Sequence, residues 1–158
     1  MKAITISILL ILVSTAGAFA RLGETLEQCQ ERYGPIVEEQ KSKDASPLDR
    51  AFVFMKNEFK VTVRLLNEKV GWILYTSRKP IFRETIDGLL DNNSEGSKWT
   101  TDETATKQEQ SAVMRKDIVY KREDRGAEAK YQEIGSYNGL LIMSSAFRKA
   151  ISPELNGL

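Results

Sequence analysis

The stretch AFVFMKNEFKVTVRLLNEKVGWILYT, residues 51–76, decides the fold that we expect for this chain. Its middle part, residues 59–66, alternates apolar with polar side chains, which is typical of a β-strand with one solvent-facing side. Asn57-Glu58 and Asn67-Glu68 flank this part and suit two-residue hairpin turns. The stretch therefore predicts three antiparallel strands, over residues 51–56, 59–66 and 69–76.

If both turns have two residues, the pairing of the three strands follows by counting residues outward from each turn. Phe54 then faces Val61, and Val63 faces Trp72. The apolar side chains that fall on one face, and that we expect to form the core, are Phe52, Phe54, Phe59, Val61, Val63, Leu65, Val70, Trp72 and Leu74. A slip by one residue would move a strand's whole apolar set to the other face, so this agreement supports the register.

The opposite face of the same predicted sheet also carries apolar and aromatic side chains, beside Lys60 and Thr62. Large apolar groups with charges around them are typical of a protein-binding surface. The predicted binding residues are Val53, Met55, Arg64, Ile73 and Tyr75. One alternative is that the C-terminal segment around Phe147 and Ile151 covers this face; another is that these are scattered exposures without a role.

The chain before these strands predicts a helix. Thr25, followed three residues later by Gln28, is the signature of a capping box at a helix start. Gly34-Pro35 ends the pattern, because glycine suits the position after a helix and proline cannot continue one. We therefore expect a helix over residues 26–33.

The second half of the chain shows a similar order. Pro80 and an apolar stripe predict a second helix ending near Asp91, followed by a polar connection, residues 93–111, that Trp99 fixes to the body. Further strands are predicted over residues 116–121, 127–132 and 140–144, with turns at 124–126 and 138–139. Residues 70–77 also resemble residues 138–145. The prediction is an α+β domain with helices on one face of an antiparallel sheet, as a tandem αβββ repeat over 22–79 and 80–151.

The first twenty residues are typical of a secretory signal peptide. Met1-Lys2 is basic, residues 3–13 are apolar, and Ala18-Phe19-Ala20 supplies small residues where a signal peptidase cleaves. A membrane anchor is the alternative, because the uncharged stretch is long, but its second half is polar. We expect residues 1–20 to be removed and residues 21–158 to form a single periplasmic or extracellular domain.

Composition excludes several kinds of chemistry. The chain has 23 basic and 22 acidic side chains, a balance that favours neither nucleic acid nor an anionic membrane as partner. It has no histidine, the commonest general base and zinc ligand, so we predict no catalytic residue, metal site or cofactor. Cys29 is the single cysteine, and its helical face with Leu26 and Tyr33 predicts a buried, unreactive thiol.

The start of the predicted domain carries a resemblance. Arg21-Leu22-Gly23-Glu24-Thr25, Gln28-Cys29 and Arg32-Tyr33-Gly34 resemble the opening of uncharacterised small exported bacterial proteins. More distantly, Gly23 through Gly34-Pro35 is similar to the helix opening of the β-lactamase-inhibitor-like and outer-membrane-assembly small-protein group. That resemblance implies helices packed on an antiparallel sheet and a function in binding other proteins. The chain lacks that group's lipid-anchor cysteine and disulfides.

These observations favour a non-enzymatic exported binding or envelope-accessory protein that uses the open sheet face to hold another envelope or secreted protein. One alternative is a carboxylate-based hydrolase or metal-assisted enzyme, because Glu84, Asp87 and Asp91 share a helical face. The other alternative is a structural homo-oligomer that uses the same sheet face. No membrane-spanning segment is expected after processing.

Overall fold

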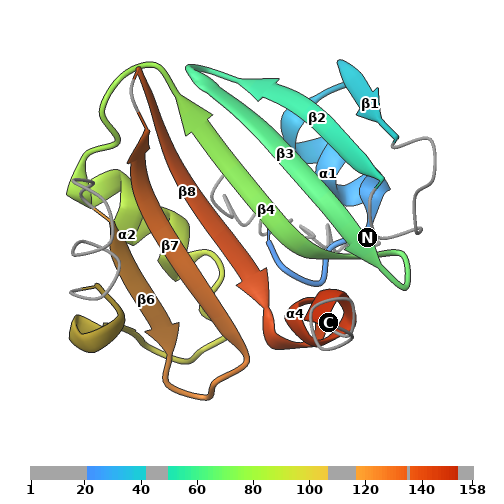
Figure 1. The fold of residues 1–158 in the computed structure, drawn as a ribbon. Coiled ribbons are helices and arrows are strands. Elements are labelled where there is room, and N and C mark those ends of the chain that lie inside the picture. Colours follow the sequence, from blue (N-terminus) through green and yellow to red (C-terminus); the bar gives the residue numbers. More distant parts are fainter. Residues whose placement is uncertain (1–20, 42–49, 107–116, 135, 153–158) are drawn as a thin grey trace, which may run out of the picture.

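The computed structural model describes residues 21–41, 50–106, 117–134 and 136–152. These ranges contain an eight-stranded antiparallel sheet with the strand order β1-β2-β3-β4-β8-β7-β6-β5 (Figure 1). The strands are β1 (Glu38–Gln40), β2 (Ala51–Lys56), β3 (Phe59–Leu66), β4 (Lys69–Ser77), β5 (Trp99–Thr101), β6 (Ile118–Arg122), β7 (Ala127–Ile134) and β8 (Tyr137–Ser144). The helices are α1 (Leu26–Tyr33), α2 (Arg83–Asp91) and α4 (Ser145–Ile151). The predicted α+β class is confirmed, and the predicted signal peptide lies outside the described residues.

Both predicted helices are present. Helix α1 has the expected bounds, and its capping box forms in both directions between Thr25 and Gln28. Gly34 ends α1 with a φ of 89°, a conformation that favours glycine, and its N–H donates to the carbonyl of Gln30. Helix α2 buries its predicted apolar stripe, Ile86, Leu89 and Leu90.

The register between β2 and β3 is as predicted, with Phe54 opposite Val61. Between β3 and β4, the register is as predicted only for the two pairs next to the turn, Leu66 with Lys69 and Leu65 with Val70. There the pairing shifts, so that Arg64 faces Trp72 and Val63 faces Ile73. Gly71 is the extra residue of this β-bulge, which opposes two residues of one strand to one of its neighbour.

The bulge reverses the two faces of β4, and the predicted positions of its side chains were therefore wrong. Ile73 and Tyr75, expected on the open face, are fully buried in the core. Trp72 and Leu74, expected in the core, are half-buried on the opposite face. Because a shift of one residue moves every following side chain to the other face, a single bulge accounts for all four errors.

The main core lies between the sheet and helices α1 and α2. Phe54, Val61, Tyr75, Leu140 and Tyr131 follow one another across five neighbouring strands and belong to this core. We call this side of the sheet the inner face and the other side the outer face. Figure 1 looks onto the outer face, with α1 and α2 behind the strands.

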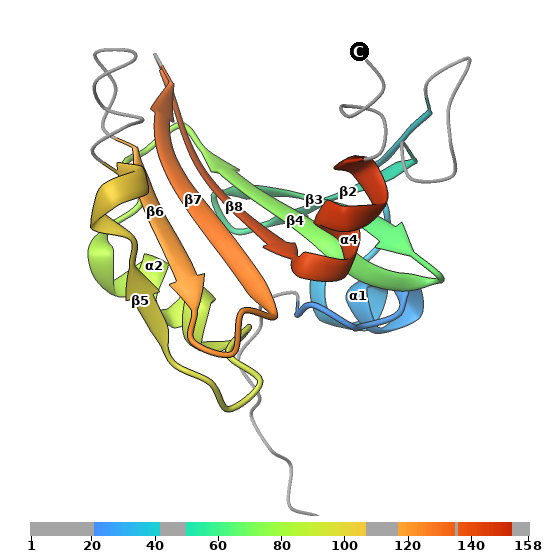
Figure 2. The same ribbon diagram turned by 60° about the horizontal axis from the view of Figure 1, so that its bottom comes forward.

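Helix α4 lies on the outer side of the sheet, so the expectation that the helices share one face is not confirmed (Figure 2). Its Phe147 is fully buried and packs on Gly71, where a Cβ would come within 2.7 Å of the ring. The C-terminal helix therefore covers the end of the outer face near the bulge. Residues around Phe147 do cover part of this face, as one of the alternatives from the sequence stated.

The second half differs from its prediction in two places. Asn138 and Gly139, expected in a turn, lie inside β8 and pair with Ser77 and Thr76 of β4. The polar connection after α2 contains a short strand, β5, whose Trp99 is half-buried and packs against the core. That packing is the role expected for Trp99.

The strand order is symmetric about the junction between β4 and β8, with four strands in each half. The predicted αβββ repeat is not confirmed, because each half has a fourth, short edge strand. The sequence likeness also pairs residues on opposite faces. It aligns Tyr75, which is buried in the core, with Met143, and half-buried Trp72 with Leu140, which is also in the core.

Candidate functional site

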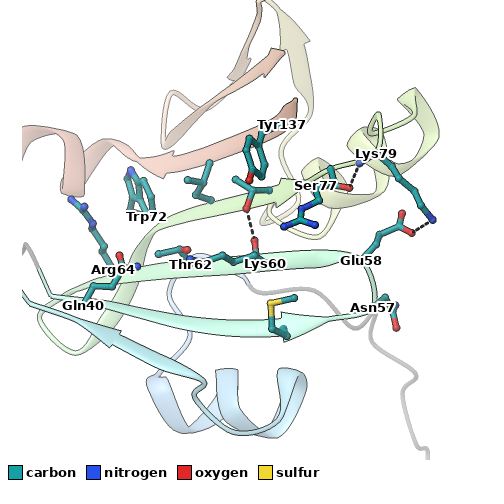
Figure 3. A pocket seen from close by; sticks show the side chains of 14 residues that line it. Gln40, Asn57, Glu58, Lys60, Thr62, Arg64, Trp72, Ser77, Lys79 and Tyr137 are labelled. Carbon is teal, nitrogen blue, oxygen red and sulfur yellow. Dashed lines mark hydrogen bonds and ion pairs between the residues drawn. The ribbon is translucent and has the colours of Figure 1, made fainter. Parts of the chain in front are cut away.

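A groove with a volume of about 870 Å³ runs over the outer face of β3 and β4 (Figure 3). We call it the outer groove. Its lining consists of Gln40, Met55, Asn57, Glu58, Lys60, Thr62, Arg64, Trp72, Leu74, Thr76, Ser77, Arg78, Lys79 and Tyr137.

Strand alternation supplies most of this lining. Every second residue of β3 from Lys60 to Arg64 points to the outer face, and the β4 residues from Trp72 to Thr76 do the same. Met55 of β2 and Tyr137 of β8 lie at the sides of the groove and are 51% and 52% exposed. The bulge at Gly71 brings the indole of Trp72 into the groove, because without it Trp72 would face the core.

Arg64 and Trp72 form a stacked pair in the groove. They are direct partners across β3 and β4, and the Arg64 guanidinium lies 4.9 Å from the centre of a Trp72 ring. Such a cation–π contact is worth about 0.5–1 kcal/mol at an exposed site. In the part of the chain that the structure describes, no carboxylate forms an ion pair with Arg64, and its buried Nε has no hydrogen-bond partner. The guanidinium of Arg64 is therefore positioned by the ring of Trp72 rather than by a carboxylate.

The outer groove is positively charged. Among its lining residues, Lys60, Arg64, Arg78 and Lys79 carry positive charge and Glu58 carries the negative charge. The Lys79–Glu58 pair is long, at 3.8 Å, and both side chains are well exposed. Exposed pairs of this kind contribute about 0–1 kcal/mol to stability, so Lys79 and Glu58 are held together only weakly.

The structure separates the five residues predicted to bind. Met55 and Arg64 line the outer groove. Val53 pairs with Thr62 on the outer face but is only 1% exposed, while Ile73 and Tyr75 belong to the core. The last three are not available to a partner, because a ligand needs an exposed side chain to contact.

Apart from Met55 and Arg64, the residues of the groove lining were not among the predicted binding residues, and two of those missed, Trp72 and Tyr137, are aromatic. Trp72 was assigned to the core because the bulge was not foreseen. Tyr137 was overlooked because the turn was placed at Asn138 and Gly139, whereas the residue begins strand β8. For Trp72 the signal was the adjacent Gly71, a residue that often marks a bulge inside a strand.

The carboxylates proposed for chemistry are dispersed. Asp87 forms an ion pair with Arg83 one helical turn away, and Asp91 lines a separate pocket of about 310 Å³ with Glu95. In the described ranges, no group of three or more cysteine, aspartate or glutamate side chains is placed to hold a metal ion. On the helix face predicted for acid–base chemistry, the carboxylate of Asp87 is therefore already in an ion pair.

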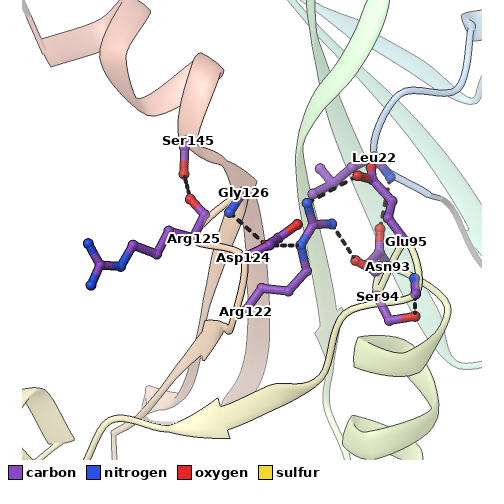
Figure 4. Close-up of polar contacts among 10 residues, drawn as sticks. Leu22, Asn93, Ser94, Glu95, Arg122, Asp124, Arg125, Gly126 and Ser145 are labelled. Carbon is purple, nitrogen blue, oxygen red and sulfur yellow. Dashed lines mark hydrogen bonds and ion pairs between the residues drawn. The ribbon is translucent and has the colours of Figure 1, made fainter.

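Glu95 belongs to a polar cluster that holds the turn after α2 (Figure 4). Arg122 of β6 has a side chain only 4% exposed, and it contacts Glu95 at 3.0 Å and Asp124 at 2.8 Å. It also donates to the carbonyl oxygen of Asn93 at 3.0 Å. The Asn93 side chain accepts from the N–H of Leu22 and donates to the carbonyl of Leu89. These contacts join the N-terminal segment, α2 and β6.

The prediction that Cys29 is buried is confirmed, since its side chain is fully covered. Burial, followed by the negative charge of Glu24, raises the pKa of the thiol to about 12. The thiolate is the reactive form of cysteine, so a thiol with this pKa is unreactive near neutral pH. The low reactivity itself stays a prediction.

Comparison with models of known families, with curated proteins and with solved structures finds no match to this chain. Within the described residues, none of the helices is both long and apolar enough to cross a membrane.

Proposed function

We propose that this chain is a non-enzymatic exported binding protein that holds another envelope or secreted protein in the outer groove. The observation that carries the proposal is the Arg64–Trp72 stack, a half-buried aromatic ring in the groove with a guanidinium that lacks an ion-pair partner in the described chain. Trp, Tyr and Arg are the residue types enriched at the centres of protein interfaces. Arg64 and Trp72 are direct partners across β3 and β4, and Tyr137 lies further along the groove, at the start of β8 beside the Asn138–Ser77 pair.

The charge of the groove defines the partner's surface. Four cations and one carboxylate line it, with Met55, Leu74 and the two aromatic residues between them. A segment that presents carboxylates beside apolar side chains complements this pattern, because unlike charges favour the encounter and apolar contacts stabilise the complex. We propose an acidic segment of the partner as the occupant.

The other two functions have weaker support. A symmetric dimer through the outer groove would bring Arg64, Arg78 and Lys79 of two copies together, and like charges at an interface oppose association. A carboxylate-based enzyme needs at least two acidic side chains close together. Among the described residues, the lining of the outer groove contains a single one, Glu58.

Three further elements belong to the same proposal. Residues 1–20 are proposed to direct export, on the pattern ending in Ala18-Phe19-Ala20. The two halves of the sheet are proposed to be a tandem repeat, since the strand order is symmetric about β4 and β8. The resemblance of residues 21–35 to the inhibitor-like and assembly group is also kept as a proposal.

A site-specific cross-link tests this function. A photoreactive phenylalanine analogue at Tyr137, in the groove, should give a cross-linked adduct to one protein in the exporting host. The same analogue at Phe82 serves as the control, because Phe82 is 70% exposed and lies outside the groove lining. Arg64→Gln should abolish the adduct at position 137. An adduct of equal yield at both positions, or one that Arg64→Gln leaves unchanged, would contradict the proposal.

A further inference from the structure

The first described residues, from Arg21, are bound to the rest of the domain. The N–H of Gly23 donates to the carbonyl of Val70, and the N–H of Val70 donates to the carbonyl of Glu24, each at 2.8 Å. The N–H of Leu22 donates to the side chain of Asn93 at 2.8 Å. The segment therefore lies along β4 with its backbone fixed immediately after the predicted cleavage site.

The backbone nitrogen of Arg21 is close to a buried carboxylate. It lies 3.1 Å from Oε2 of Glu24, whose residue is only 9% exposed. The other oxygen of this carboxylate, Oε1, contacts the guanidinium of Arg32 in α1. The carboxylate of Glu24 thus contacts the guanidinium of Arg32 with one oxygen. Its other oxygen accepts from the backbone nitrogen of Arg21, which would become the new N-terminus.

We propose that Glu24 is the receptor for the α-ammonium group that cleavage between Ala20 and Arg21 creates, so that processing adds an ion pair to the folded domain. In that hydrolysis the peptide C–N bond breaks and water supplies a hydroxyl to the carbonyl carbon of Ala20 and a hydrogen to the nitrogen of Arg21. The resulting amine takes a proton from solvent at neutral pH, because its ordinary pKa is about 8.

The new group improves on the amide that it replaces. The amide N–H already donates to this carboxylate, and the ammonium adds a full opposite charge at the same place, which turns the hydrogen bond into an ion pair. Burial of Glu24 limits the screening of this pair by water and salt. The pocket of about 310 Å³ beside Arg21 also presents Asp91 and Glu95, and Glu95 is bound to Arg122.

The pair predicts a pH dependence, because the neighbouring groups keep their charge where the amine titrates. The charged groups around the amine are Glu24, with Arg32 on its other oxygen, and Asp91, Glu95 and Arg122 at the adjoining pocket. Burial raises the pKa of Cys29 to about 12 and that of Tyr33 and Tyr75 above the ordinary value, so all three stay uncharged. An ion pair raises the pKa of the amine, so its stabilisation is present at low pH and disappears as pH rises through that raised value.

The test compares two chains that start at Arg21 and contain every described helix and strand: one with a free amine and one with an acetylated amine. The free form should have the higher urea midpoint at pH 7, and the difference should vanish near pH 11. Introducing Glu24→Gln into both chains should remove the difference at pH 7. Equal midpoints, or a difference that survives Glu24→Gln, would overturn the proposal.

A second measurement does not depend on that variant folding. The pKa of the Arg21 amine, followed by NMR or by its acylation rate in the unmodified chain, should lie above the ordinary value of about 8. A value at or below 8 would overturn the proposal. Both tests use chains with a defined N-terminus, so they hold whether or not the host processes the precursor at Ala20.

Discussion

Trp72 and Tyr75 are three residues apart on one strand and have opposite roles. Tyr75 is fully buried, its ring packs edge-on against Phe59 at 6.3 Å, and its hydroxyl lies 3.5 Å from that of Tyr33. Trp72 is half-buried on the outer face under the guanidinium of Arg64. Tyr75 therefore contributes to the core at this point of the molecule, whereas Trp72 belongs to the lining of the outer groove.

This contrast makes the first prediction. Tyr75→Ala should lower the free energy of unfolding by about 3–5 kcal/mol, the range for removing a large aromatic side chain from a core. Trp72→Ala should lower it by clearly less, since the outer side of the indole already faces solvent. Urea unfolding of both variants measures the difference. A larger loss for Trp72→Ala would mean that the indole, and not the phenol, packs in the core.

At the scale of elements, the bulge in β4 couples the sheet to α4. Gly71 leaves the space that the Phe147 ring fills, and a Cβ there would lie 2.7 Å from that ring. Gly71→Ala should destabilise the protein by about 1–3 kcal/mol, the usual effect of overpacking a buried site. Thermal unfolding measures the effect.

Gly88 is the matched control, because it lies in α2 and a Cβ added there would have nothing within 4 Å. Gly88→Ala should stabilise the protein by up to about 1 kcal/mol, since alanine favours a helix over glycine. If both substitutions had the same sign, the close packing of Phe147 on Gly71 would not be the cause of the effect.

The strands were predictable where polar and apolar residues alternate, as from Phe59 to Leu66. They were not predictable at β1 and β5, which are three residues long and carry no periodic pattern. The register of β4 was ambiguous because residues 72–75 are all apolar or aromatic, so either face could be the buried one. That ambiguity removed Trp72 from the predicted site and added Ile73 and Tyr75. Arg64 was placed correctly by the alternation of β3, and Met55 by its pairing with that strand.

At the scale of the whole molecule, the two faces of the sheet differ: one is packed against the core and the other carries the outer groove. The inner face holds the core under α1 and α2, and α4 closes one end of the outer face beside the bulge. The outer groove lies over β3 and β4 on that face, and its lining carries an excess of positive charge. The central claim is that this groove binds an acidic segment of another protein.

The most direct test compares two charge reversals in the affinity for the protein that the Tyr137 cross-link identifies. Arg64→Glu changes the groove, while Lys98→Glu makes the same change in net charge at an exposed residue outside its lining. At one ionic strength, Arg64→Glu should weaken binding by about thirtyfold or more, which corresponds to about 2 kcal/mol, and Lys98→Glu should leave it within about twofold. Equal losses for the two variants, or full affinity for Arg64→Glu, would contradict the claim.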